Sequence, residues 1–215
     1  MQNNRRNNNL NFDIIPESIV KKMLDPRGYE AAFIVGKMVG DKSKLLSVGG
    51  GYGRDYYYLS PLGKEVTVFD IAKQSHLPEL IKGDITKGTP FADKQFDAVI
   101  MGEILEHLIE DKQALTEINR ILADDGILVV TVPLYNDKGE FHVRIHSPLS
   151  IKRLLAACGF SVEKVIYRGG LISFPGFLKK LRAVLFYLTF SFLSKDKFHK
   201  EKFKERFCLC IARFD

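Results

Sequence analysis

A short apolar run, Leu45–Val48, leads directly into four glycines at positions 49, 50, 51 and 53, and a helix-forming stretch begins at Arg54. Glycines at the end of a buried strand let the backbone turn sharply and approach a ligand closely, because no Cβ atom stands in the way. In an open α/β sheet, ligands bind outside the carboxyl ends of the strands, where such a turn lies. The run therefore predicts a ligand-binding strand–turn–helix unit.

Apolar, β-branched segments alternate with helix-forming segments along most of the chain. Alternation of this kind is typical of βαβ units, with a parallel sheet covered by helices on both faces. The last segment lies far from its predecessor, so we expect it to be an inserted antiparallel strand. The chain is thus predicted to be one doubly wound α/β domain. Strands are expected at 44–48, 65–70, 79–85, 96–102, 127–133, 161–167 and 206–214, and helices at 54–60, 105–122 and 147–159.

Composition limits the class of protein further. With 46% hydrophobic and 27% charged residues the chain has the make-up of a globular protein. Three cysteines without a C-x-x-C pair argue against a disulfide framework and a structural zinc site. Residues 1–11 contain six asparagines, which predicts a disordered tail rather than a secretory signal and favours a cytoplasmic protein. We expect short helices within 12–40 and the main domain at 41–215.

Further motifs follow the glycine run in a fixed order. Asp70 ends the second predicted strand, where a carboxylate can accept hydrogen bonds from both hydroxyls of a ribose. Asp84 and Ile85 follow the third strand, where they could contact an adenine. The glycine spacing is G-x-G-x-G, whereas a dinucleotide fingerprint would need a glycine at Arg54. Downstream come FDAVIMGEILEHL at 96–108, ALTEINRIL at 114–122 and GILVV at 126–130.

Taken together, these motifs resemble the class I S-adenosylmethionine-dependent methyltransferases, in particular the type-11 branch that includes ubiquinone and menaquinone methyltransferases. The resemblance covers about residues 40–168. It implies a seven-stranded, mostly parallel sheet whose last strand is antiparallel and inserted beside the fifth. It also implies S-adenosyl-L-methionine as the methyl donor and a small-molecule, sugar or lipid-like acceptor. The cofactor-binding residues that it implies are Gly49, Gly50, Gly51, Gly53, Asp70, Ile71, Asp84, Ile85 and Glu103.

One position departs from the family pattern. Two residues before the first glycine the family usually has Asp or Glu, and this chain has Ser47. In the family that carboxylate helps to hold the methionine amino group, so here we expect weaker cofactor binding or another acceptor. The departure leaves open a second class of function, a methyltransferase-like binding module without turnover that acts at a membrane surface or in an assembly.

Three histidines are candidates for the catalytic step. A general base is needed only when the acceptor is a weak nucleophile such as a hydroxyl. His107 follows the fourth predicted strand, and His142 and His146 follow the fifth, over the same crevice. Glu103, Glu106 and His107, with a later histidine, also match the E-x-x-E-H pattern of methyltransferases that use a divalent metal. The same string is frequent in relatives with no known metal, so no metal site is predicted.

The positive charge lies near the carboxyl terminus. Residues 1–170 hold 22 basic and 22 acidic side chains, so the net charge of +6 belongs to residues 171–215, and nucleic acid is not expected as a partner. An insertion at about 169–205 is predicted to be helical and contains an uncharged run too short to span a bilayer. It is expected to be a lid over the acceptor site or a peripheral membrane helix at 171–205, with an oligomer contact as the third alternative.

Overall fold

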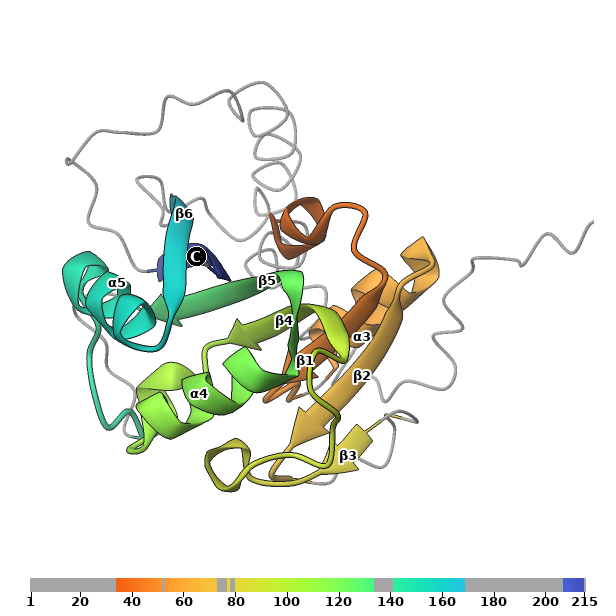
Figure 1. Ribbon diagram of the computed structural model, residues 1–215, viewed down its shortest axis with the longest axis horizontal. Helices are drawn as coiled ribbons and strands as arrows, with labels where there is room; N and C mark the ends of the chain where they lie inside the picture. Colours follow the sequence, from red (N-terminus) through yellow and green to blue (C-terminus); the bar gives the residue numbers. More distant parts are fainter. Residues whose placement is uncertain are drawn as a thin grey trace, which may run out of the picture.

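A computed structural model describes residues 34–51, 53–72, 77, 80–133, 141–168 and 207–214. Residues 34–39 are helical, and the remaining elements follow in the order of the sequence (Figure 1). The strands are β1 (Lys44–Val48), β2 (Glu65–Asp70), β3 (Leu80–Lys82), β4 (Phe96–Gly102), β5 (Leu122–Pro133), β6 (Phe160–Arg168) and β7 (Phe207–Phe214). The helices are α3 (Arg54–Leu59), α4 (Asp111–Ile121) and α5 (Pro148–Ala157), with 3-10 turns η2 (Ser60–Leu62), η3 (Ile85–Lys87) and η4 (Leu105–His107).

The strands form one sheet in the order β3-β2-β1-β4-β5-β7-β6. The first five strands of this order pair in parallel, and β7 runs antiparallel between β5 and β6. Strand order reverses between β1 and β4, which are neighbours in the sheet although β2 and β3 separate them in the chain. The predicted α/β class with a parallel sheet is confirmed, and the reversal places a crevice at the carboxyl ends of β1 and β4.

Helices cover both faces of the sheet because side chains alternate along each strand. Leu46 of β1 and Val99 of β4 pack with α4 and α5 in one apolar cluster. Leu45 and Ala98, each one residue earlier, pack on the opposite face with α3 and the helix at 34–39. Successive strand residues point to opposite faces, so near-continuous apolar strands are what a doubly covered sheet requires. In Figure 1, α4 and α5 lie on the near side of the sheet.

The start of α5 agrees with the prediction from the sequence. Ser147 is its N-cap, accepting a hydrogen bond from the Ser150 backbone, and Pro148 is its first residue, as predicted. The prediction of one helix over 105–122 was wrong in its bounds. η4 occupies only 105–107, Leu108 is extended, and α4 begins at Asp111. The chain changes direction here because the Glu106 carbonyl oxygen accepts hydrogen bonds from the 143–144 backbone instead of continuing a helix.

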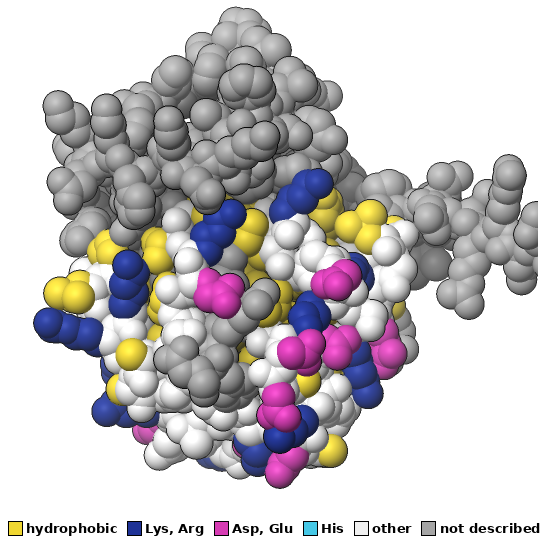
Figure 2. All heavy atoms as spheres, turned by 45° about the horizontal axis from the view of Figure 1, so that its top comes forward, with side chains coloured by type: hydrophobic (Ala, Val, Ile, Leu, Met, Phe, Trp, Pro, Cys, Tyr) yellow, Lys and Arg dark blue, Asp and Glu magenta, His cyan; other side chains and the backbone are white. Residues whose placement is uncertain are grey.

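Several expectations fall on other parts of the chain. The tail at 1–11, most of the segment 12–40 and the insertion at 169–205 lie outside the described residues. Among the helices that the structure describes, none is long and apolar enough to cross a membrane. Figure 2 shows acidic and basic side chains interspersed over the described part of one face, in keeping with the charge balance of residues 1–170.

Asp97 joins the start of β4 to the start of β1. Its Oδ2 accepts hydrogen bonds from the backbone nitrogens of Ser43 (3.2 Å) and Lys44 (2.9 Å) and from the Ser43 hydroxyl (3.0 Å). The bond from the Lys44 backbone is the largest of the causes that lower the pKa of the Asp97 carboxyl. The ionised carboxylate therefore stabilises the register of the two central strands.

We expect Asp97→Asn to lower the free energy of unfolding at pH 7 by about 1–2 kcal/mol, because charge-assisted hydrogen bonds are replaced by weaker ones. A depressed folded-state pKa contributes stability above the unfolded value of about 4, which is lost as pH falls through the folded value. The difference between wild type and variant in urea denaturation should therefore shrink below about pH 4. A difference that stays constant down to pH 2 would contradict this assignment.

Candidate cofactor and acceptor site

The glycine loop closes the carboxyl end of β1 by a backbone that only glycine adopts readily. Gly49, Gly51 and Gly53 have φ angles of 64°, 52° and 81°. A Cβ built on Gly49 would lie 1.9 Å from Cδ1 of Ile104, so this glycine allows the residues after β4 to approach the loop. A Cβ on Gly50 would strike Val68 at 2.3 Å. Gly51 differs, because among the described residues only the Gly49 carbonyl oxygen, at 3.8 Å, lies within 4 Å of its built Cβ. The loop therefore presents an open face at Gly51.

Asp70 lies beside that open face. Its Oδ2 accepts a hydrogen bond of 3.0 Å from the Gly51 backbone nitrogen, and its Oδ1 accepts one of 2.8 Å from Ala72. The carboxylate is half-buried at the end of β2, and Ile71 beyond it is 67% exposed. The structure thus brings together Gly51, Asp70 and Ile71, three of the residues expected to bind the cofactor.

Asp84 and Ile85 are occupied by local structure. Asp84 caps η3 and accepts hydrogen bonds from the backbone nitrogen (3.0 Å) and hydroxyl (2.7 Å) of Thr86. The Thr86 hydroxyl is the first cause of the lowered pKa of the Asp84 carboxyl. Ile85 is 5% exposed and packs in the core cluster under α4. Both residues lie just after β3, and their contact with an adenine stays a prediction.

A buried carboxylate lies next to Ser47. The Ser47 hydroxyl donates to Oδ2 of Asp55 at 3.2 Å, and the two residues are 1% and 4% exposed. Asp55 also pairs with the Arg54 guanidinium, whose Nε lies 2.9 Å from Oδ1, and this pairing raises the pKa of Arg54. A Cβ built on Gly102 would lie 2.8 Å from Nη2 of Arg54, so the pair reaches from α3 to the end of β4.

Glu103 follows β4 at the same edge of the sheet and has a φ of 58°, uncommon for a residue other than glycine. Its backbone nitrogen donates to the Thr131 carbonyl oxygen at 2.9 Å, and its Oε1 accepts from the Thr131 hydroxyl at 2.8 Å. The carboxylate of Glu103 also adds to the raised pKa of Arg54. Arg54, Asp55 and Glu103 therefore form a charged group at the crevice.

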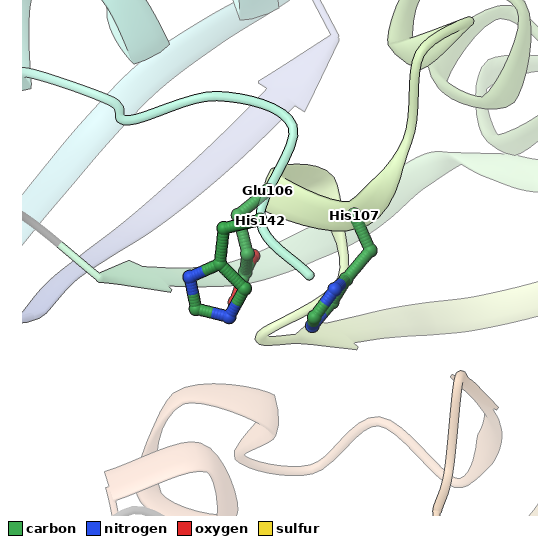
Figure 3. A group of neighbouring side chains, drawn as sticks. All are labelled: Glu106, His107 and His142. Carbon is green, nitrogen blue, oxygen red and sulfur yellow. The ribbon is translucent and has the colours of Figure 1, made fainter. Parts of the chain in front are cut away.

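The three candidate histidines do not lie together. His107 and His142 form an edge-to-face pair with ring centroids 4.6 Å apart, and Glu106 lies beside them (Figure 3). His146 is 3% exposed, and burial lowers its pKa. His146 has a hydrogen bond with the backbone of Leu105, whereas His107 is exposed and His142 is half-buried.

Asp55 is the residue that motif reading missed. It follows the glycine loop inside the first turn of α3. Acidic residues are common in a first turn because they interact favourably with the helix dipole, so Asp55 did not stand out. The sequence offered one indication of this role: Ser47 stands where the family has a carboxylate, and Asp55 follows eight residues later. That pairing gains meaning only when the strand and the helix are seen to face each other.

The strand order, with its reversal between β1 and β4, matches the Rossmann-like fold of class I S-adenosylmethionine-dependent methyltransferases. Residues 46–130 match the family model Methyltransf_11, a methyltransferase domain, so this part of the chain is a methyltransferase domain of that type. No curated protein sequence matches the chain significantly.

Solved structures with the same fold share little sequence with this chain. One is a 1,6-didemethyltoxoflavin-N1-methyltransferase of Burkholderia thailandensis with bound S-adenosylhomocysteine, at a TM-score of 0.63 and 16% identity over 94% of this chain and 88% of that one. A methyltransferase of Aquifex aeolicus matches at 0.58 and 20%, covering 91% and 97%. One of Archaeoglobus fulgidus matches at 0.59 and 15%, covering 89% and 98%. Each supports the fold.

The contact between Ser47 and Asp55 predicts a compensating pair of substitutions. Asp55→Leu should lower the free energy of unfolding by about 2–3 kcal/mol, because the half-buried Arg54 loses its carboxylate. Ser47→Asp should also destabilise, because two carboxylates then lie within hydrogen-bond distance. In the double variant one carboxylate again faces Arg54.

Urea denaturation of the four proteins gives the coupling free energy. We expect the double variant to be at least 1 kcal/mol more stable than the sum of the single effects predicts, about the size of one charged hydrogen bond. Additive single effects would mean that the two positions do not share one carboxylate site.

Proposed function

We propose that this enzyme transfers a methyl group from S-adenosylmethionine, bound across the glycine loop, to a small-molecule acceptor bound beside η4 and the segment 141–146. The carrying observation is the hydrogen bond between the Gly51 backbone nitrogen and Asp70. It holds a half-buried carboxylate next to a glycine whose built Cβ has no side chain of the described residues within 4 Å. A nucleoside needs that combination, with carboxylate oxygens for the ribose hydroxyls and an unobstructed backbone beneath them.

The sulfonium of the donor supplies an activated methyl group. A lone pair of the acceptor forms the new bond to the methyl carbon while the carbon–sulfur bond breaks, which leaves S-adenosylhomocysteine. The chain's task is then to align the two reactants, and positioning alone can lower such a barrier by several kcal/mol. His107 and His142 lie at the crevice, where either can take a proton from an acceptor hydroxyl.

Asp55 supplies the carboxylate that the family has at position 47. The Ser47 hydroxyl and the Asp55 carboxylate are in contact, so the anion occupies nearly the same place, although it comes from α3 instead of β1. Glu103 adds a second carboxylate at the end of β4. These two groups are the acceptors that we assign to the methionine amino group. We also assign to β7 the role of the antiparallel strand that completes the seven-stranded sheet of the family.

Four exposed apolar side chains lie on the two segments that we assign to the acceptor. Ile109, Phe141, Val143 and Ile145 are between 51% and 81% exposed, and a hydrogen bond of 3.1 Å from Arg144 to the Ile109 carbonyl oxygen joins their two segments. Exposed apolar side chains gathered near a site favour a ligand with apolar surface. The Burkholderia relative acts on 1,6-didemethyltoxoflavin, a small molecule. We therefore infer a small or lipid-like acceptor with an apolar portion.

Calorimetric titration with S-adenosylmethionine tests the cofactor site. We expect Asp70→Ala to weaken binding by about 2–3 kcal/mol, because two charge-assisted hydrogen bonds to the ribose are lost. Gly51→Val should abolish binding, because its side chain would enter the open face of the loop. Asp125→Ala and Gly63→Val are the matched controls. Asp125 is on the surface, and Gly63 has a φ of 82° and no atom of the described residues within 4 Å of its built Cβ.

The controls should bind the cofactor as wild type does. Gly63→Val carries a strain similar to that of Gly51→Val, so equal loss in both would trace to folding rather than to the site. Normal binding by Asp70→Ala and Gly51→Val would place the cofactor elsewhere. Binding without formation of S-adenosylhomocysteine over a panel of acceptors would favour the alternative, a binding module without turnover.

A membrane-surface role for residues 171–205 is a separate proposal, supported by the excess of positive charge there. Co-sedimentation with anionic liposomes should fall as salt rises, because each basic residue near the surface contributes about 1 kcal/mol that ions screen. The triple change of Leu185, Phe186 and Phe190 to Ser should remove the binding that remains at high salt. If wild type ignores liposomes while the triple variant stays folded but loses acceptor affinity, the segment is a lid.

A further inference from the structure

We propose that Thr131 is a positioning residue for the methyl donor, because its hydroxyl turns the Glu103 carboxylate toward the methionine amino group. This inference rests on the proposed function, which assigns that amino group to Asp55 and Glu103. Thr131 is 8% exposed and lies on β5, beside Gly102 of β4 in the parallel ladder. Buried hydroxyls form hydrogen bonds, and the bonds of this one lead to the residue that follows Gly102.

The Thr131 hydroxyl contacts both the side chain and the backbone of Glu103. It donates to Oε1 of the carboxylate at 2.8 Å and accepts from the backbone nitrogen at 3.1 Å. The same nitrogen also donates to the Thr131 carbonyl oxygen at 2.9 Å. A hydroxyl has one proton to donate and lone pairs to accept with, so both of its bonds form together. Because a β-branched side chain is stiff at χ1, β5 fixes the hydroxyl and the hydroxyl fixes the carboxylate.

The backbone of Glu103 gives an independent reason to expect a functional role here. Its φ of 58° lies in the left-handed region, which a residue with a side chain adopts only at a cost in free energy. Such conformations persist where the surrounding contacts over-determine them, and they cluster at functional sites. The bonds from Thr131 are contacts of this kind. They hold Glu103 at the carboxyl end of β4, next to Ile104, which packs against Gly49 of the glycine loop.

Arg54 offers the Glu103 carboxylate a competing partner. A Cβ built on Gly102 would lie 2.8 Å from Nη2 of Arg54 and 3.7 Å from Oγ1 of Thr131, so both side chains reach the same space. Asp55 first and Glu103 in addition raise the pKa of Arg54 through their negative charge. Guanidinium and carboxylate groups form strong bidentate pairs, so an unrestrained carboxylate here would turn toward Arg54. The bond from Thr131 fixes Oε1 of Glu103, and Arg54 stays paired with Asp55.

The position of Thr131 has a consequence for ligand selectivity. The amino acid part of S-adenosylmethionine carries a charged amino group, and S-adenosylhomocysteine shares this group. The nucleoside 5′-methylthioadenosine has the adenosine and the sulfur but lacks the amino acid part. An oriented Glu103 carboxylate therefore strengthens the binding of the first two ligands alone. Thr131 contributes to selectivity without touching any ligand.

Calorimetric titration of the full-length protein with these three ligands tests the role. We expect Thr131→Val to weaken the binding of S-adenosylmethionine and S-adenosylhomocysteine by at least about 10-fold, since a hydrogen bond to a charged group contributes that much. The binding of 5′-methylthioadenosine should stay as in wild type. Thr131→Ser keeps the hydroxyl and should bind all three ligands nearly as wild type does.

A double-mutant cycle shows whether Thr131 acts through Glu103. Glu103→Ala should weaken the binding of S-adenosylmethionine at least as much as Thr131→Val does. In the Glu103→Ala background Thr131→Val should cause no further loss, because the carboxylate that Thr131 orients is gone. Thr116→Val is the matched control, since it makes the same change on the exposed side of α4, where the hydroxyl donates to the Lys112 carbonyl oxygen. It should bind all three ligands as wild type does.

Equal weakening of all three ligands by Thr131→Val, unchanged binding of S-adenosylmethionine, or additive losses in the cycle would each overturn the role of Thr131. The thermal midpoint shows whether each variant is folded. If the valine variant unfolds, Thr131→Cys gives the same comparison, because its thiol is of similar size and a much weaker donor. Wild type that binds none of the three ligands would reject the proposed function itself, whereas an unselective Thr131→Val would reject only this inference.

Discussion

β1 is hydrogen-bonded along its whole length to β2, and over four of its five residues also to β4, with both pairings parallel. Its carboxyl end is therefore fixed from both sides, and the glycine loop must begin where Asp70 and Gly102 also end their strands. Gly49 donates to the Phe69 carbonyl oxygen, which carries the β1–β2 ladder into the loop. Asp97 stabilises the opposite end of β1 and β4. The positions of the glycine loop, Asp70 and Glu103 therefore depend on the pairing of β1 with β2 and β4.

Much of this arrangement could be predicted from the sequence, because its causes are local. Apolar runs at Leu45–Val48 and in β4 fit strands buried on both faces, and the glycines after β1 fit positive φ angles. Ser147 and Pro148 encode the start of α5 in two adjacent residues. A buried strand followed by such a loop has few alternative structures, so the fold class followed from short stretches of chain.

Contacts between segments far apart in the sequence could not be predicted in the same way. The helix expected from residue 105 stops short because the Glu106 carbonyl oxygen bonds to residues 143 and 144, some 37 positions later. Ile85 fits an adenine contact by its place after β3, yet it packs under α4. Asp55 and Ser47 are close in the chain, but whether a helix side chain reaches a strand depends on how α3 lies on the sheet.

The docking of the segment after β5 onto η4 has an evolutionary consequence. Its contacts include main-chain hydrogen bonds to the Glu106 carbonyl oxygen, the ion pair of Arg144 with Asp111 and the hydrogen bond of Arg144 to the Ile109 carbonyl oxygen. Main-chain bonds do not depend on the identity of the side chains, so Phe141, Val143 and Ile145 can be exchanged while the segment keeps its place. At the glycine loop, by contrast, Ile104 packs so closely against Gly49 that a larger side chain at position 49 would clash. Substitutions at 141, 143 and 145 should therefore change acceptor preference with little change in the free energy of unfolding. One fold can in this way acquire different acceptors.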